Sequence, residues 1–300
     1  MIPRFDELMQ AAETAFTKDD FEGSAALYAE AVEVARECGD PDRADRAFCN
    51  HCSVLVELDR GADQIPKLKE ILLRSGNTRN RFHAAYCTAV AYDISGEGDK
   101  AQGYADRAAS LAGELGDPVS ESRSFNLVGN LSIRSSKFPE AESAFVRSLE
   151  AHRDLNGHHR MTEAQVRDNL GYVMMCTDRL QEGISLCEEA RSDFERLGAD
   201  HYLYETLQDL CYGHLLADNL DRAQECGERA LDLAVEFEDD QVAKNCLFLL
   251  SETAVRRGDT FRARRYLREL TAYYPEVGIS EEIIDVFLAT DLTSVVNLRG

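Results

Sequence analysis

The amino-acid sequence predicts an all-α fold built from repeated pairs of helices. Apolar residues recur at three- and four-residue spacing along most of the chain, which is the spacing of one helix face. Short polar turns with Gly, Asp or Asn separate these stretches, and the pattern repeats about every 40 residues. No stretch alternates apolar and polar residues for long enough to predict a strand.

The repeat is clearest in a small residue that opens the second helix of each pair. Successive copies lie 40, 42, 40 and 40 positions apart, at Ala101, Ala141, Gly183, Ala223 and Ala263. Two more sets of small residues mark where helices should cross, since small side chains let helix axes approach to about 8–10 Å. The sets are Ala12, Ala89, Gly129, Gly171 and Ser251, and Ala31, Ala108, Ser148, Ala190 and Ala230.

The joints between pairs carry signals for helix ends and starts. Gly39, Gly116 and Gly198 are each expected to end a helix, and the Asp or Pro that follows shortly after is expected to begin the next. The copy in residues 42–75 matches the pattern poorly, and its register is left open. Pro66 fits there only near the start of a helix.

These features resemble the tetratricopeptide repeat family over about residues 5–275. The resemblance rests on the small residue of each first helix and on turns with an aromatic residue or Leu, such as 20–23 and 258–263. The period exceeds the family's usual value of about 34, as in the longer units of kinesin light chains and bacterial peptide-sensing regulators. Armadillo and HEAT arrays are the structural alternative, but the tight turns and the small residues argue against them.

The resemblance implies a right-handed superhelical solenoid of about seven helix pairs over residues 1–275. A C-terminal capping helix is expected within residues 276–300, because Ser280 and the two acidic residues after it are typical of a helix start. A tail that docks on another chain is the alternative for this segment.

The resemblance also implies that the first helices line a concave groove in which a ligand binds. Residues at fixed offsets from the small crossing residue would face that ligand, as would Glu205 and Gln208 in the same register. The candidate groove residues are Arg123, Asn126, Asn130, Arg134, Asp168, Asn169, Tyr172, Asp209, Tyr212 and Asn245. Asn can both donate to and accept from a peptide backbone, Arg pairs with carboxylates, and Tyr adds contact area. The competing interpretation is that these are ordinary polar residues on exposed helix faces.

The charge balance narrows the class of partner. With 55 acidic and 33 basic residues the formal net charge is −22, which repels nucleic acid and favours a basic partner. Solvation of the outer helix faces is the alternative explanation. Six arginines crowd into residues 256–268, where they could bind an acidic partner, pair with residues 236–240, or face solvent.

Location can also be inferred from the sequence. No window approaches the roughly 18 uncharged apolar residues of a membrane helix, and no secretory signal is visible at the N-terminus. The nine cysteines are scattered singly, so a disulfide framework is not expected and a reducing cytoplasm is the predicted location.

No motif predicts catalysis, and we expect no enzyme activity, cofactor or metal. Cys49 and Cys52 resemble half of a zinc site, but a structural zinc needs four ligands and no second pair exists. His158 and His159 lie in a polar joint without further ligands nearby. Neither a phosphate-binding loop nor a nucleophile motif is present.

The predicted function is therefore that of a scaffold or adaptor, which binds a peptide segment or partner helix in the groove. One alternative is a peptide-sensing regulatory subunit. Since no helix-turn-helix or catalytic domain precedes Phe5 or follows Gly300, we would expect its effector to be a separate chain. Self-association through the ends of the solenoid, giving a homo-oligomer, is the other alternative.

Overall fold

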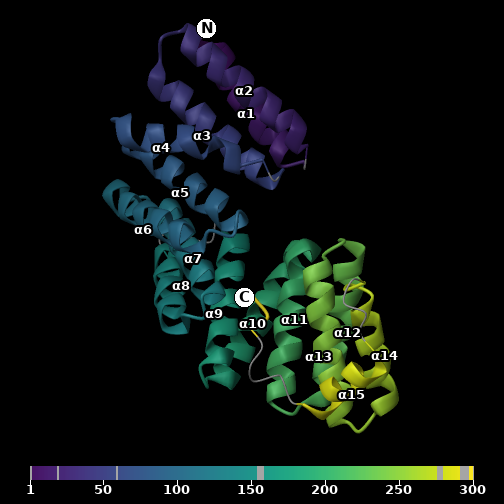
Figure 1. Ribbon diagram of the computed structural model, residues 1–300. Helices are drawn as coiled ribbons and strands as arrows, with labels where there is room; N and C mark the ends of the chain where they lie inside the picture. Colours follow the sequence, from purple (N-terminus) through teal and green to yellow (C-terminus); the bar gives the residue numbers. More distant parts are fainter. Residues whose placement is uncertain are drawn as a thin grey trace. The chain divides into compact units, whose positions relative to one another are not determined.

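The computed structural model describes residues 2–18, 20–58, 60–153, 159–275, 280–290 and 297–299, and these form helices and turns without strands. Seven successive helix pairs and one further helix follow one another along this part of the chain (Figure 1). The predicted all-α helical-repeat fold is therefore confirmed. The chain divides into two compact units. Unit 1 comprises residues 1–135 and 150–155, and unit 2 comprises residues 136–149 and 156–300.

Unit 1 consists of helices that pack against their neighbours along the chain. They are α1 (Ile2–Phe16), α2 (Phe21–Glu37), α3 (Pro41–Glu57), α4 (Ile65–Arg74), α5 (Thr78–Ile94), α6 (Gly98–Leu115) and α7 (Pro118–Arg134). The poorly matching repeat contains a short 3-10 helix, Ala62–Gln64, before the ten-residue α4. Pro66 lies in the first turn of α4, as predicted.

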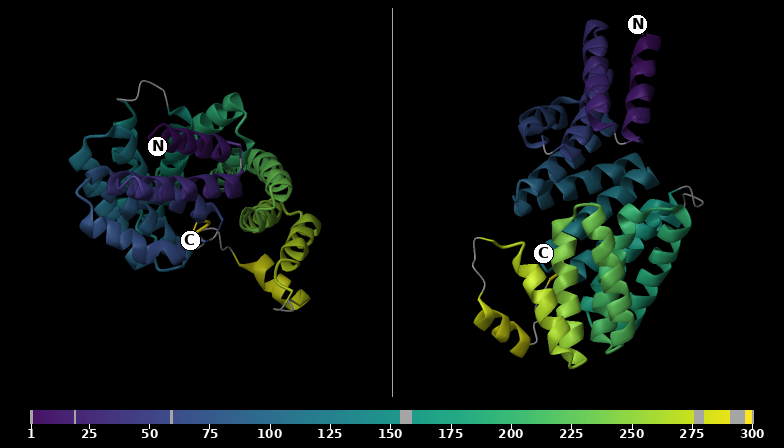
Figure 2. Two further views of the ribbon diagram at one scale, coloured as in Figure 1. Left: turned by 90° about the horizontal axis from the view of Figure 1, so that it is seen from above. Right: turned by 90° about the vertical axis from the view of Figure 1, so that its right-hand side faces the viewer.

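Unit 2 is built in two layers. After α8 (Phe138–Arg153), which the two units share, come α9 (Arg160–Cys176), α10 (Leu180–Leu197), α11 (Asp200–Leu216), α12 (Leu220–Glu236), α13 (Asp240–Arg256), α14 (Thr260–Thr271) and α15 (Glu281–Ala289). The first helices contact one another, α9 with α11 and α11 with α13, whereas among the described residues α10 with α12 and α12 with α14 have at most marginal contact. Helices α9, α11 and α13 are therefore the inner layer, and two further views show this unit from other sides (Figure 2).

The joints between pairs form as the sequence predicts. Gly39, Gly116 and Gly198 all have positive φ angles, between 59° and 66°, in the left-handed region that a Cβ disfavours. The Asp40 side chain then accepts a hydrogen bond of 3.1 Å from the backbone N–H of Arg43, which caps α3.

Small residues allow the helices of a pair to approach closely, as the crossing pattern predicts. A Cβ built on Gly171 of α9 would lie 2.6 Å from the Cys187 sulfur and 2.8 Å from the carbonyl oxygen of Gly183, both on α10. Ala190 and Ala230, at the second crossing position, are completely buried. The close packing of α9 on α10 places Cys187 directly beneath the inner layer.

Helix α15 packs against α14, and its Ile284 is buried. Two arginines of the 256–268 cluster pair with this helix: Arg268 Nε donates to Glu281 Oε1 at 2.8 Å, and Arg264 pairs with both Glu281 and Asp285. These two arginines therefore pair with α15, and not with residues 236–240 as one alternative from the sequence had it. Among the described residues, no helix is both long and apolar enough to span a membrane.

Candidate functional site

Six candidate groove residues lie on the inner layer of unit 2. Asp168, Asn169 and Tyr172 belong to α9, Asp209 and Tyr212 belong to α11, and Asn245 belongs to α13. The rings of Tyr172 and Tyr212 lie 6.1 Å apart, so adjacent helices meet through aromatic contact. Five of the six, all but Tyr212, contact one short segment of the same chain that forms a turn, Asn297–Arg299, which we call the inner segment.

Side chains of the inner layer hold the backbone of the inner segment. The Tyr172 hydroxyl accepts a 3.0 Å hydrogen bond from the Leu298 N–H and donates one of 3.0 Å to the Asn297 side-chain oxygen. The Asn245 amide donates to the Leu298 carbonyl oxygen at 2.9 Å and to the Gln208 side-chain oxygen at 3.0 Å. Leu298 is thus bound through both its backbone donor and its backbone acceptor, and its side chain is buried.

The arginine of the inner segment lies between two buried carboxylates. Arg299 Nη2 is 2.7 Å from Asp168 Oδ2 and also pairs with Asp209, while Nη1 contacts the Asn169 side-chain oxygen. The guanidinium lies over the Tyr172 ring, 5.1 Å from its centroid. Asp168 and Asp209 are 4% and 0% exposed, so neither charge is solvated and the guanidinium is their counter-charge.

Burial dominates the electrostatics of the Asp209 carboxyl. It raises the pKa of Asp209 to about 7, although the Arg299 guanidinium opposes the rise, and the neighbouring Asp168 and Glu205 charges add to it. Burial alone would lower the pKa of Arg299, but the carboxylates of Asp209 and Asp168 outweigh it and hold that pKa above its ordinary value. The arginine therefore stays charged, and Asp209 titrates near neutral pH.

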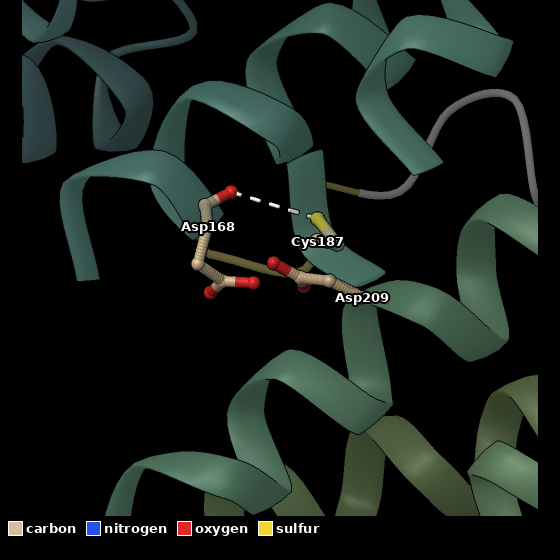
Figure 3. Close-up of side chains that lie close together, drawn as sticks. All are labelled: Asp168, Cys187 and Asp209. Atoms are coloured by element: carbon tan, nitrogen blue, oxygen red, sulfur yellow. Dashed lines mark hydrogen bonds between the residues drawn. The ribbon is translucent and has the colours of Figure 1, made fainter. Parts of the chain in front are cut away.

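The same carboxylates are part of a group that could be interpreted as a metal site. In Figure 3, the side chains of Asp168 and Asp209 face one another beside Cys187, and each of the three offers a ligand atom within 4.8 Å of the others. Metal ligation needs the thiolate. Burial raises the pKa of the Cys187 thiol well above its usual range, and the thiol donates to the Asp168 backbone oxygen at 3.7 Å. The donor set therefore suits an organic cation better than a metal ion.

The four candidate groove residues of unit 1 lie on α7 and are arranged differently. Arg123 is exposed and lies over the Tyr86 ring at 4.8 Å, and Arg134 forms an ion pair with Asp93 of α5. Asn126 and Asn130 are half-buried on the same helix. The structure thus assigns two of these residues to contacts between neighbouring helices, and a ligand role for all four stays a prediction.

Sequence reasoning missed Arg299 and Cys187 as members of the site. Arg299 lies 90 residues from Asp209 and 131 from Asp168, outside the repeat, so neither periodicity nor spacing links them. Cys187 occupies a small apolar position in α10, where the sequence indicates packing alone. The half zinc site is also a packing feature: Cys49 and Cys52 are buried in one core cluster with Cys87. His158 lies outside the described residues.

No protein-family model and no curated protein matches the sequence. Solved structures match the fold. The apo form of RapI is 11% identical over 98% of this chain and 85% of its own, with a TM-score of 0.67. NprR in complex with its cognate peptide NprX is 12% identical over 96% of this chain and 81% of its own, with a TM-score of 0.66.

A third similar structure is a signal-transduction ATPase from Pyrococcus horikoshii that has a tetratricopeptide repeat sensor. It is 16% identical over 93% of this chain and 44% of its own, with a TM-score of 0.67. At these identities the likeness shows the fold alone. The fold is that of tetratricopeptide-like helical repeats, as the sequence resemblance implies.

Proposed function

We propose that this chain is a non-catalytic adaptor or sensor that binds an extended peptide segment of a partner on the inner layer of unit 2. The observation that carries the proposal is the binding of Leu298 by the Tyr172 hydroxyl and the Asn245 amide. Groups that donate to and accept from backbone atoms can bind a peptide whatever its side chains are. The site therefore has the contacts that a peptide ligand needs.

The fold comparison supports a sensor more than a passive scaffold. NprR, which shares the fold, is described in complex with its cognate peptide. By analogy, we infer that a peptide bound across α9, α11 and α13 would change the arrangement of these helices. The protein in its changed arrangement would then act on a separate effector chain. The acidic surface favours a basic partner, and nine free thiols suit the reducing cytoplasm as its location. The proposal includes no nucleic acid or membrane partner.

A selection for peptide ligands tests this function. A random peptide library would be selected on wild type and on the full-length Arg299→Ala variant, so that the outcome does not depend on whether the inner segment blocks the site. Because Asn245 contacts a backbone atom, Asn245→Ala should weaken every selected peptide by about tenfold, regardless of its sequence.

Two matched variants locate the binding surface. Gln224→Ala removes a half-buried amide of α12 that bonds to Glu228 of the same helix, and it should leave the affinities unchanged. Peptides that lose affinity with Asn126→Ala but not with Asn245→Ala would place binding on unit 1. A library that yields no ligand for either protein would count against peptide recognition as a whole.

A further inference from the structure

The contacts of Arg299 point to the chemistry of the partner. Resting on the peptide-binding role above, we propose that unit 2 selects a peptide through an arginine side chain that follows an apolar residue. We further propose that the inner segment Asn297–Arg299 is an internal ligand that competes for the same contacts.

The pocket matches a guanidinium in shape as well as in charge. Its acceptors, two carboxylates and one amide oxygen, come from two helices and accept from the two terminal nitrogens of the group, while the Tyr172 ring covers its face. A planar fork satisfies several acceptors at once and stacks on an aromatic ring, whereas an ammonium group is a compact point charge. Arginine should therefore be preferred to lysine.

The internal ligand leaves part of the pocket unsatisfied. Two buried carboxylates face one guanidinium, and Asp168 Oδ1 is buried without a hydrogen-bond partner among the described residues. A buried carboxylate oxygen without a donor costs free energy. A peptide that supplies one more donor at this point would bind better than the inner segment does, so the segment can be displaced.

Competition follows because the contacts are the same atoms. An incoming peptide cannot bond to the Tyr172 hydroxyl, the Asn245 amide and the acid pair while Leu298 and Arg299 occupy them. A tethered segment has an effective concentration on the order of millimolar. It therefore lowers the apparent affinity for any free peptide, and removing its arginine should raise that affinity.

The probe for this proposal is a fluorescein-labelled peptide with the sequence of residues 295–300, Val-Val-Asn-Leu-Arg-Gly. Fluorescence polarisation would measure its binding to wild type, to Arg299→Ala and to Arg268→Ala. Arg268 is an exposed arginine that pairs with Glu281 outside the pocket, which makes its variant the matched control. We expect Arg299→Ala to bind at least tenfold more tightly than wild type and Arg268→Ala to bind as wild type does.

Two further comparisons test the selectivity. Lysine or glutamine in place of the peptide's arginine should weaken binding to Arg299→Ala by about tenfold or more, since each gives up the fork and the stacking. Adding Asp168→Asn and Asp209→Asn to Arg299→Ala should abolish the preference for arginine. Equal affinity of wild type and Arg299→Ala, or equal affinity for the three peptides, would overturn the proposal.

A measurement on wild type covers the case in which Arg299→Ala does not fold. The Arg299 Nη–H groups, which donate to Asn169, Asp168 and Asp209, should give protected NMR signals, and excess unlabelled peptide should shift them to the positions of a free arginine. An unchanged signal at saturating peptide would also overturn the proposal. If the selected peptides lack arginine, depend on Asn245 and bind wild type and Arg299→Ala equally, this inference fails and the proposed function stands. If no peptide binds any variant, both fail.

Discussion

Asp209 should make unit 2 less stable when it is ionised, and replacing it with Asn should relieve this. The carboxyl is completely buried, and its pKa is raised from 3.8 to about 7. The sign follows from linkage: a raised pKa means that the folded state prefers the protonated form, so stability is lost as pH rises from 3.8 through 7. At about 1.4 kcal/mol per pH unit, the loss above pH 7 is on the order of 4 kcal/mol.

Asp209→Asn keeps the shape and the acceptor oxygen but cannot ionise. Its free energy of unfolding should therefore exceed that of wild type by about 2–4 kcal/mol at pH 8 and by about 1–2 kcal/mol at pH 5. Urea titrations followed by circular dichroism would measure this, with hydrogen exchange of α9 and α11 assigning the change to unit 2. Asp209→Asn should also bind the labelled peptide of residues 295–300 more weakly than wild type does. Asp209 would then be a residue that contributes to binding and lowers stability.

Asp232→Asn is the control for the loss of one negative charge, because Asp232 is exposed on α12. Its effect on stability should stay within about 0.5 kcal/mol at both pH values. The reasoning would be refuted if Asp209→Asn were less stable than wild type at pH 8. The ionised carboxylate and the Arg299 guanidinium would then stabilise the fold by more than burial of the charge costs.

Three further outcomes are expected. Gly171→Ala should destabilise unit 2 by about 1–3 kcal/mol in a urea titration, because its Cβ would lie 2.6 Å from the Cys187 sulfur and 2.8 Å from the Gly183 carbonyl oxygen. Glu238→Gly should raise the melting temperature and stabilise by about 0.5–1 kcal/mol, since Glu238 has a φ of 57°. The affinity of Arg299→Ala for the arginine peptide should increase from pH 6 to pH 8, because the cation binds the ionised form of Asp209, which Asp168 and Glu205 also face.

Each of these outcomes has its own control. Gly113→Ala should stabilise unit 1 by about 1 kcal/mol, since a Cβ there meets nothing within 4 Å and Ala is the better helix former. As the control for Glu238→Gly, the separate variant Gly198→Ala should lower the melting temperature, because it introduces a Cβ at a φ of 66°. The pH prediction would be wrong if the peptide bound more tightly at pH 6, or if the pH dependence persisted in Asp209→Asn.

The repeat could be predicted because each helix pair restates the same local rules. Apolar spacing, a small residue at each crossing and a Gly at each joint all act within a few residues of one another, so one chain contains several copies of the same signal. The register of residues 42–75 could not be predicted because a 3-10 helix and a helix of only ten residues replace the usual second helix of that pair. Pro66 still indicated where the short helix begins.

The sequence predicted the inner-layer residues of the site but not the segment that binds them. Fixed offsets from the crossing residues placed Asp168, Asp209 and Asn245 on one layer, because α9, α11 and α13 occupy equivalent places in successive pairs. Those offsets describe what a helix face presents and contain no information about what covers it. Arg299 covers it from outside the repeat, and a contact across 90 or more residues leaves no local pattern.

The inner segment also has a mechanical consequence. Its three residues contact α9, α11 and α13, which belong to three successive pairs, so it acts as a brace across repeats that otherwise touch only their neighbours. Repeats joined only in series stretch and twist like a spring, and a brace stiffens them. Release of the inner segment would therefore make unit 2 more flexible, and a partner's peptide that makes the same three contacts would restore its stiffness.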